Sequence, residues 1–323
     1  NFISIDQFQG PFTNPLPESA FGNNIRNKKE WSANTYRLAI DYDVSDNMMA
    51  YASYATGFVA GGFSETCGSP TSCAAYEDEE NDNFEVGVKY DSDDGKLRLN
   101  VAAFNTQYEN LQRDTVVTIK DAAGNTFQET KAVNEGESTA RGLEVELTYV
   151  PTPNFRIDFN WGWLDHEYDS YNPGADPAPM GLSGGARRFD FSSLDVPYSP
   201  SNQGGLSMTY VHDLANGSAF TYNVALDYQA EFEINPFPAN AQGADASGNP
   251  IVKQKGNTNA ESRTLLNAYV TWESADENFD ITLYGRNLGD ETYRVSANPV
   301  ATLWNFTRHG PPRQIGIQLG YSF

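Results

Sequence analysis

The sequence predicts an all-β protein: a transmembrane antiparallel β-barrel, of which this chain supplies about eleven strands. Apolar side chains alternate with polar or small ones at a period of two, which is the repeat of a β-strand. The connections also alternate, with short turns near residues 45, 92, 152, 215 and 275 and long segments between them. Outer-membrane barrels sort their connections in this way, with short turns on the periplasmic side and long loops outside. A soluble sandwich has no reason to do so.

The predicted strands follow one another from residue 34 to the last residue. They are 34–45, 48–58, 83–90, 97–103, 143–149, 155–163, 206–210, 220–228, 266–272, 279–283 and 313–323. Residues 1–30 are rich in Asn, Pro and Gly and predict a loop with at most a short strand. A small hairpin is expected around the AAGN segment, residues 122–125, inside a long connection. For 48–58 both parities are mixed, so the pattern does not assign its two faces.

The two parities of these strands differ sharply in chemistry. One parity is almost purely aliphatic and aromatic, as in Ile315, Ile317 and Leu319 of the last strand. The other carries charges of both signs: Arg37, Asp41, Glu85, Lys89, Glu144, Glu146, Arg156, Asp158, Asp227 and Arg286. A charge on the lipid face costs roughly 2–4 kcal/mol near the bilayer centre, so the charged parity is expected to face a polar lumen.

Composition excludes two other classes of protein. No apolar run approaches the roughly 18 residues that a membrane-spanning helix needs, which excludes a helical membrane protein. The formal net charge of -22 would repel phosphate backbones, so nucleic acid is not expected as a partner. The aromatic content of 13% fits strands and interfacial girdles.

Cys67 and Cys73 lie six positions apart in a Gly/Ser/Pro-rich stretch and predict a local disulfide, formed in an oxidising compartment. The alternative is a metal-binding pair, which would need further ligands nearby, and the histidines are distant in sequence. The acidic run 77–82 lacks the register of a dedicated calcium loop. The sequence therefore predicts no metal site and no cofactor. No signal peptide is visible at Asn1, so we expect either that one was removed or that the gene begins further upstream.

Strand parity predicts where the first residues lie. If the last strand runs towards the periplasm, the strand at 34–45 does too, and residues 1–30 are an extracellular loop or the end of a preceding strand. Eleven strands that start outside cannot close a single-chain barrel, which normally has an even number. We therefore expect further strands in residues that precede this sequence.

Two segments near the C-terminus carry a family resemblance. NLGDETY (287–293) followed by GPPRQIGIQLGYSF (310–323) resembles the C-terminal signature of TonB-dependent outer-membrane receptors. The matching residues are Asn287, Leu288, Asp290, Tyr293, Gly310, Pro312 and Arg313. YASYATGFVAGGF (51–63) and ARGLEVELTYVPTPNF (140–155) are similar to the family's mid-barrel motif and Gly-x-Glu hairpin. The resemblance implies that residues 31–323 are the C-terminal half of a 22-stranded barrel with a plug, and that the plug domain is absent from this chain.

The same resemblance implies a function in active transport. The full-length receptor would bind a scarce nutrient, most commonly a ferric siderophore or a similar metal chelate, and import it with energy from the TonB complex, acting through the plug. It would be a multi-pass protein of the bacterial outer membrane, with long loops extracellular and the C-terminus periplasmic. Its other expected partners are outer-membrane lipid, lipopolysaccharide and the barrel assembly machinery, whose signal Tyr321 and Phe323 resemble.

Candidate ligand-facing side chains lie just before the last strand and at the end of the second. Trp304, Phe306, Arg308 and His309 combine aromatic rings with cations that could meet an anionic chelate. Phe58 and Phe63 flank a Gly-rich segment. In each case the alternative is structural: a loop that packs its own aromatics, or glycines that permit a sharp bend.

Two other functions remain as alternatives. A passive porin would show the same alternation and lumen charges, but the closing motif favours a receptor. An enzyme would need catalytic residues, and neither a G-x-S-x-G segment nor a His-bearing motif occurs, so no enzymatic activity is predicted.

Overall fold

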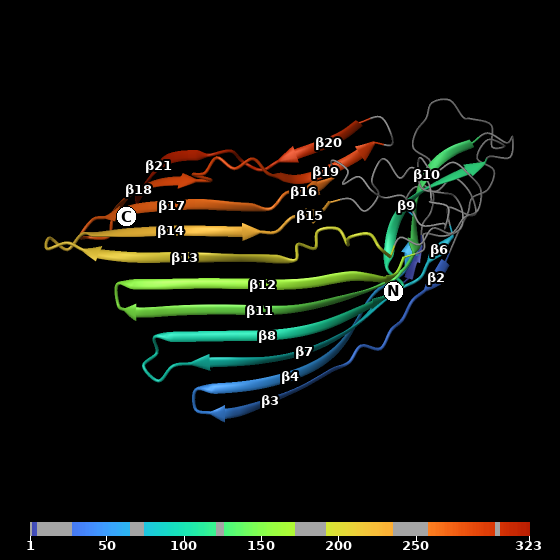
Figure 1. Cartoon of the computed structure of the whole chain (residues 1–323), viewed down its shortest axis with the longest axis horizontal. Coiled ribbons are helices and arrows are strands. Elements are labelled where there is room, and N and C mark those ends of the chain that lie inside the picture. The colour runs from blue at the N-terminus through green and yellow to red at the C-terminus, as the bar shows by residue number, and fades with distance from the viewer. Residues whose placement is uncertain are drawn as a thin grey trace.

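The protein is described here as a computed structural model that covers residues 2–4, 28–64, 74–120, 126–171, 192–234, 258–300 and 304–323. Within these ranges every regular element is a β-strand (Figure 1). None of the described segments is a helix of the length and hydropathy that membrane spanning requires.

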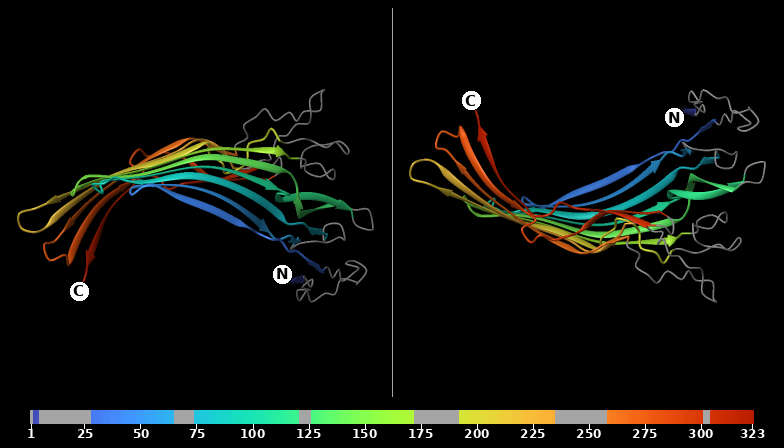
Figure 2. Two further views of the ribbon diagram at one scale, coloured as in Figure 1. Left: turned by 90° about the horizontal axis from the view of Figure 1, so that it is seen from below. Right: turned by 90° about the horizontal axis from the view of Figure 1, so that it is seen from above.

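One antiparallel sheet of eleven strands forms the body of the molecule. Its strands, in spatial order from one edge to the other, are β21 (Gln314–Tyr321), β18 (Phe279–Arg286), β17 (Arg263–Glu273), β14 (Ala219–Gln229), β13 (Asn202–Asp213), β12 (Phe155–Ser170), β11 (Glu137–Thr152), β8 (Leu97–Glu109), β7 (Glu79–Asp91), β4 (Met48–Val59) and β3 (Arg37–Ser45). These are the eleven strands expected from the alternation, so the predicted fold class is confirmed. Along the described chain, β3 and β21 are the two edges, and the sheet between them is arched (Figure 2).

Ten further strands form two-stranded sheets in the long connections and in the N-terminal segment that precedes β3. They pair as β1 (Phe2–Ser4) with β2 (Lys28–Glu30), β5 (Gly62–Phe63) with β6 (Ala75–Tyr76), β9 (Gln112–Lys120) with β10 (Thr126–Asn134), β15 (Phe232–Glu233) with β16 (Asn259–Ala260), and β19 (Arg294–Val300) with β20 (Trp304–His309). The β9–β10 hairpin confirms the one expected around residues 122–125. The β19–β20 hairpin occupies part of the segment that we expected to be a loop.

The short and long connections lie at opposite ends of the sheet (Figure 1). The short turns are residues 46–47, 92–96, 153–154, 214–218 and 274–278, and the C-terminus lies at the same end. Gly95 and Gly217 occupy two of these turns with φ of 67° and 86°, a backbone region that favours glycine. The predicted alternation of short and long connections therefore places all short turns at one end of the sheet and the long connections at the other.

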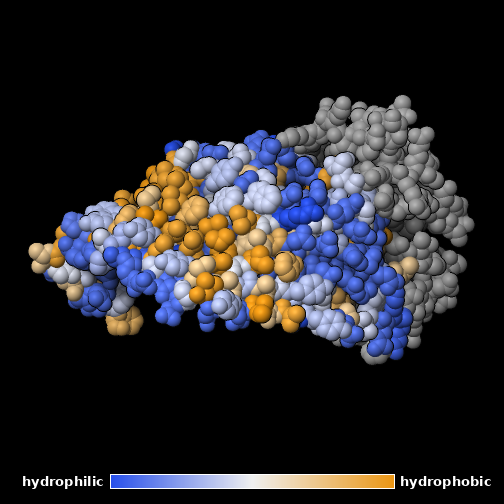
Figure 3. Space-filling model, turned by 60° about the horizontal axis from the view of Figure 1, so that its bottom comes forward, coloured by the Kyte–Doolittle hydropathy of each residue, from blue (hydrophilic) through white to orange (hydrophobic). Residues whose placement is uncertain are grey.

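Strand register lines the apolar residues up into continuous rows. One row crosses eight neighbouring strands as Met48, Tyr90, Leu99, Leu147, Phe159, Leu206, Leu226 and Leu266. The row beside it, on the opposite face, contains Lys89, Asn100, Glu146, Asn160, Gly205 and Asp227. Figure 3 shows the apolar side chains as a broad patch with hydrophilic regions on either side.

The apolar face is fully open, unlike that of a soluble sheet. Leu38 is 74% exposed and Ile315 is 70% exposed, although both belong to the apolar parity. The buried apolar residues gather instead at the end with the long connections, and two clusters form there around Tyr171 and Ile234. Among the described residues the sheet therefore has no hydrophobic core beneath it, and a lipid environment is what its apolar face requires.

Candidate functional site

The polar face of the sheet carries a row of carboxylates half-way along the strands. Tyr51 donates its hydroxyl to Glu85 at 2.8 Å, Asn100 donates to Glu146 at 3.2 Å, and Asn267 donates to Asp227 at 3.0 Å. These partners are neutral, whereas the ion pairs Arg98–Asp91 and Arg156–Asp158 lie nearer the short turns. The middle of this face therefore presents negative charge and hydrogen-bond acceptors.

A recess of about 420 Å³ lies over this part of the sheet. The recess spans five neighbouring strands, β11 to β14 and β17, and its lining includes Glu144, Glu146, Asn160, Asp227 and Arg263. Since carboxylates outnumber the single arginine among these side chains, the recess suits cationic groups and hydrogen-bond donors.

Aromatic rings on the polar face lie flat against glycines of the adjacent strand. Tyr51 pairs in register with Gly87, Phe104 with Gly142, and Tyr284 with Gly316. A Cβ atom added at Gly87, Gly142 or Gly316 would overlap the partner ring. Only glycine leaves room for a ring in this position, so these pairs keep large side chains close to the sheet.

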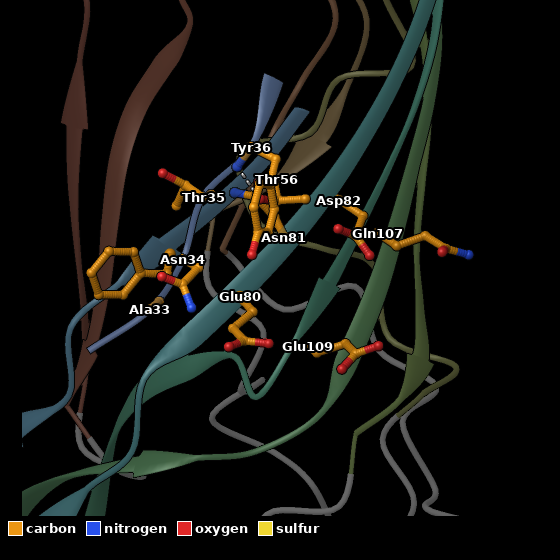
Figure 4. Close-up of a pocket in the computed structure, with 12 residues that line it drawn as sticks. Ala33, Asn34, Thr35, Tyr36, Thr56, Glu80, Asn81, Asp82, Gln107 and Glu109 are labelled. Atoms are coloured by element: carbon orange, nitrogen blue, oxygen red, sulfur yellow. Dashed lines mark hydrogen bonds between the residues drawn. The ribbon is translucent and has the colours of Figure 1, made fainter. Parts of the chain in front are cut away.

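A cavity of about 160 Å³ lies near the long connections, where the chain enters β3 (Figure 4). It is lined by Ala33, Asn34, Thr35, Tyr36, Thr56, Gly57, Phe58, Glu80, Asn81, Asp82, Gln107 and Glu109. Tyr36 donates its backbone N–H to the Thr56 hydroxyl at 2.9 Å, which fixes one wall of the cavity. The lining is rich in carboxylates and amides and contains no cation.

The residues of the closing motif come together between the end of β18 and the start of β21. The Asn287 amide donates to the carbonyls of Glu291 and Pro311 at 2.8 and 3.2 Å and accepts from the Glu291 N–H at 2.9 Å. Asp290 accepts from the Arg313 N–H at 3.1 Å and lies 3.4 Å from its guanidinium. Asn287 and Asp290 both have positive φ, which Asn and Asp tolerate better than most residues.

The remaining motif residues complete this arrangement. Tyr293 is buried, and its ring occupies the space that a side chain at Gly310 would need. The Leu288 side chain lies in the same way against Gly285, and Pro312 joins Pro311 to Arg313. The motif is thus a clasp that links β18 to β21 across the β19–β20 hairpin.

The predicted ligand-facing group near the last strand is part of β20. Phe306, Arg308 and His309 are exposed, and the side chain of Trp304 lies outside the described residues. These positions pair with Asn298, Ser296 and Arg294 of β19, so they sit on a hairpin. Their role in ligand binding stays a prediction.

Phe58, in β4, and Phe63, in β5, have different surroundings. Phe58 borders the 160 Å³ cavity. Phe63 is buried and packs edge-to-face against Trp31, with ring centroids 5.7 Å apart. The contact with Trp31 gives Phe63 a packing role, and its predicted role towards a ligand stays untested.

Cys67 and Cys73 lie outside the described residues, so the disulfide stays a prediction. Along the described chain, no three His, Cys, Asp or Glu side chains are grouped as metal ligands would be. The alternation of the sequence also did not reveal that the rings of Tyr51 and Phe104 lie on the polar face. A large apolar ring on the polar parity cannot be told from one on the apolar parity by alternation. Strand register, once the turn lengths are known, pairs each ring with its glycine and would have revealed them.

Comparison with known proteins places these features in a family. The profile described as "TonB dependent receptor-like, beta-barrel" matches residues 5–288. A probable TonB-dependent siderophore receptor, PiuA of Acinetobacter baumannii, is 28% identical over 167 residues, which are 50% of this chain and 21% of that protein. The metal-pseudopaline receptor CntO of Pseudomonas aeruginosa is 26% identical over 135 residues, 42% of this chain and 17% of that protein.

Solved structures share the fold. The ferric yersiniabactin uptake receptor FyuA of Yersinia pestis superposes with a TM-score of 0.68 at 18% identity, covering 92% of this chain and 38% of that one. The siderophore receptor PiuA of Acinetobacter baumannii superposes with a TM-score of 0.57 at 22% identity, covering 88% and 35%. The segments of this chain that align with the curated relatives span about a fifth of those proteins' length.

Proposed function

The chain belongs to the TonB-dependent receptor-like β-barrel family, and from this we propose that the full-length protein imports a scarce solute across the outer membrane with energy from TonB. The family match over residues 5–288 carries the proposal. The sheet supports it, because one face is apolar and exposed along its length while the other is polar. The closing clasp gives further support, since the motif that suggested the family has a defined structural role.

The proposed substrate class is a ferric siderophore or a similar metal chelate. Support comes from the relatives, which are named as a siderophore receptor and a metal-pseudopaline receptor. A ferric siderophore is too bulky and too dilute for diffusion through open pores, so binding must precede passage. On this proposal the polar face lines the lumen, and exposed groups such as Arg308 and Phe306 contribute to capture.

The orientation and the partners follow from the same proposal. The long connections face outward and the C-terminus lies in the periplasm, as is usual for outer-membrane barrels. The apolar face contacts outer-membrane lipid, and the surface between this face and the long connections contacts lipopolysaccharide. The TonB complex acts through a plug, and the barrel assembly machinery reads the end of β21.

Uptake by intact cells tests the proposal. Deletion of the gene should abolish accumulation of at least one chelate from a panel of ⁵⁵Fe-labelled catecholate, hydroxamate and mixed-ligand siderophores. The same loss is expected when TonB is removed and the receptor kept. Free ion conductance by the full-length protein in planar bilayers, together with unchanged uptake in both deletions, would contradict the proposal and favour a passive porin.

We also propose a disulfide between Cys67 and Cys73, which mass spectrometry tests separately. The intact mass should not change on alkylation without reduction and should rise by two alkyl groups after reduction. Addition of two alkyl groups to the unreduced sample would show that Cys67 and Cys73 are free thiols and would contradict the disulfide.

A further inference from the structure

The two strands of the β9–β10 hairpin, residues 112–120 and 126–134, leave the main sheet as a separate arm (Figure 1). Asn110 and Gly136, with φ of 56° and 99°, turn the chain out of β8 and back into β11. Leu111 donates its N–H to Gly136 at 3.1 Å, and Glu135 donates to Leu111 at 2.8 Å, which closes the base of the arm. The orientation of the arm must therefore be set by contacts at this base.

Gln112 and Asn134 face each other in register at the base. The Gln112 side-chain amide donates to the carbonyls of Val59, Ala60 and Glu77 at 3.2, 3.2 and 3.1 Å. Its backbone N–H donates to the Glu79 carboxylate at 2.7 Å. One side chain thus joins both ends of the β4–β7 connection to the arm.

Asn134 holds the same connection from the opposite strand of the arm. Its side-chain amide donates to the carbonyls of Glu77 and Asn110 at 2.9 and 3.0 Å, and its oxygen accepts from the Glu77 N–H at 2.6 Å. Further along, Ala132 donates its N–H to the Ser64 hydroxyl at 3.0 Å. The arm and the β4–β7 connection are therefore joined by side-chain bonds to backbone groups at several points.

The other side of the base is held by aromatic packing. Arg113 lies 5.9 Å from the centre of the Tyr168 ring and donates to its hydroxyl at 3.3 Å. Leu111 packs in a buried cluster with Tyr168, Tyr171 and Val196. Arg113 thus anchors the arm to the end of β12, so the base of the arm is fixed on two sides.

We propose that Gln112 and Asn134 are positioning residues that hold the arm and the β4–β7 connection together as one body. Carbonyls outside a sheet ladder need other partners, and here side-chain amides supply them. We call these bonds of Gln112 and Asn134 the joint. The joint sets the spacing between the arm and the segment that carries Phe58 and Phe63. This inference goes beyond the proposed transport and needs no solute to be tested.

Hydrogen–deuterium exchange of the full-length protein in lipid nanodiscs tests the joint. Gln112→Glu and Asn134→Asp keep the side-chain shape but remove the N–H donors. The neutral variant Gln112→Met removes the donor without adding charge. Each variant should raise exchange in residues 59–64 and 74–79 by about fivefold, as expected when roughly 1 kcal/mol of hydrogen bonding is lost locally. The ladder at residues 48–55 and 83–91 should not change.

Gln318→Glu, on the exposed surface of β21 and far from the arm, is the matched control and should leave both regions unchanged. Unchanged exchange in residues 59–64 and 74–79 for Gln112→Met and Asn134→Asp would overturn the proposal. A rise in Gln112→Glu alone would assign the effect to charge and overturn it equally. Should these variants fail to assemble, Ser64→Ala removes the hydroxyl that accepts the Ala132 N–H and should raise exchange at Ala132. No rise there would contradict the contact between the arm and the β4–β7 connection.

Discussion

At the scale of single residues, the polar face is shaped by pairs of a ring and a glycine. Phe104 lies over Gly142, and Tyr51 over Gly87, where a Cβ atom would overlap the ring. The sequence alone did not predict these pairs, because they depend on the register between strands. A glycine inside a strand normally weakens it, so its presence opposite an aromatic residue indicates close packing.

Gly142→Ala should lower the free energy of unfolding by about 1–3 kcal/mol, because the added methyl group displaces the Phe104 ring. The measurement is urea unfolding of the full-length protein in lipid vesicles. Gly162→Ala is the control, since the atom nearest to a Cβ added at Gly162 is the Gln203 Cγ, 3.9 Å away. In the double variant with Phe104→Ala, the cost of Gly142→Ala should fall, because only the Trp163 carbonyl, 3.0 Å from an added Cβ, remains close. Equal costs with and without the ring would contradict the packing argument.

Two short turns use the same pattern of hydrogen bonds around an aspartate. The Ser92 hydroxyl donates to Asp94 at 2.7 Å and the Lys96 N–H donates to it at 3.1 Å, while Ser274 and Asn278 bond Asp276 in the same way. The serine hydroxyl and the backbone N–H lower the pKa of both carboxylates. A lowered pKa in the folded state means that the carboxylate stabilises the turn above the unfolded pKa of about 3.9 and loses this effect as pH falls through the folded pKa.

Asp94→Ala and Asp276→Ala should therefore destabilise the protein at pH 7, and the difference from wild type should shrink as the pH falls below about 4. Unfolding midpoints measured across this pH range check the prediction. Asp46→Ala, in the turn between β3 and β4, is the matched control. A difference that stays constant down to strongly acidic pH would argue against a role for the charged form.

At the scale of elements, period-two alternation predicted ten strands of the main sheet, and β4 was predicted as a strand without an assignment of its faces. The mixed parity of β4 has a physical reason: Tyr51 faces the polar side over Gly87, while small residues such as Ala50 and Ala52 face the apolar side. The β19–β20 hairpin was not predicted, because a strand outside the lipid region needs no alternation. The joint at Gln112 and Asn134 was also invisible, since its partners are backbone carbonyls of a distant segment.

The last strand, β21, combines an edge position with an aromatic end. Tyr321 and Phe323 stack with ring centroids 6.3 Å apart, and both are highly exposed. If the assembly machinery reads this end, Phe323→Ala should lower the amount of full-length protein in the outer membrane without lowering its synthesis. Gln318→Ala, an exposed residue of the same strand, should assemble normally. Normal levels of Phe323→Ala would count against the signal.

At the scale of the whole molecule, the sheet divides into an apolar face and a polar face without a core between them. Its polarity and its sorted connections were readable from the sequence because the bilayer constrains every strand alike. The identity of the solute was not readable, because specificity depends on side chains in connections that follow no repeat. The central claim is that the apolar face meets lipid and the polar face lines a water-filled or plug-filled lumen.

Spin labels at neighbouring positions of β14 test this claim most directly. Leu226→Cys and Asp227→Cys lie on opposite faces in one strand, and Cys67 and Cys73 would be replaced by serine in this background. With the full-length protein in lipid vesicles, the label at 226 should collide mainly with oxygen dissolved in the bilayer. The label at 227 should collide with oxygen far less often than the label at 226. Equal oxygen accessibility at the two positions would contradict the assignment of the faces.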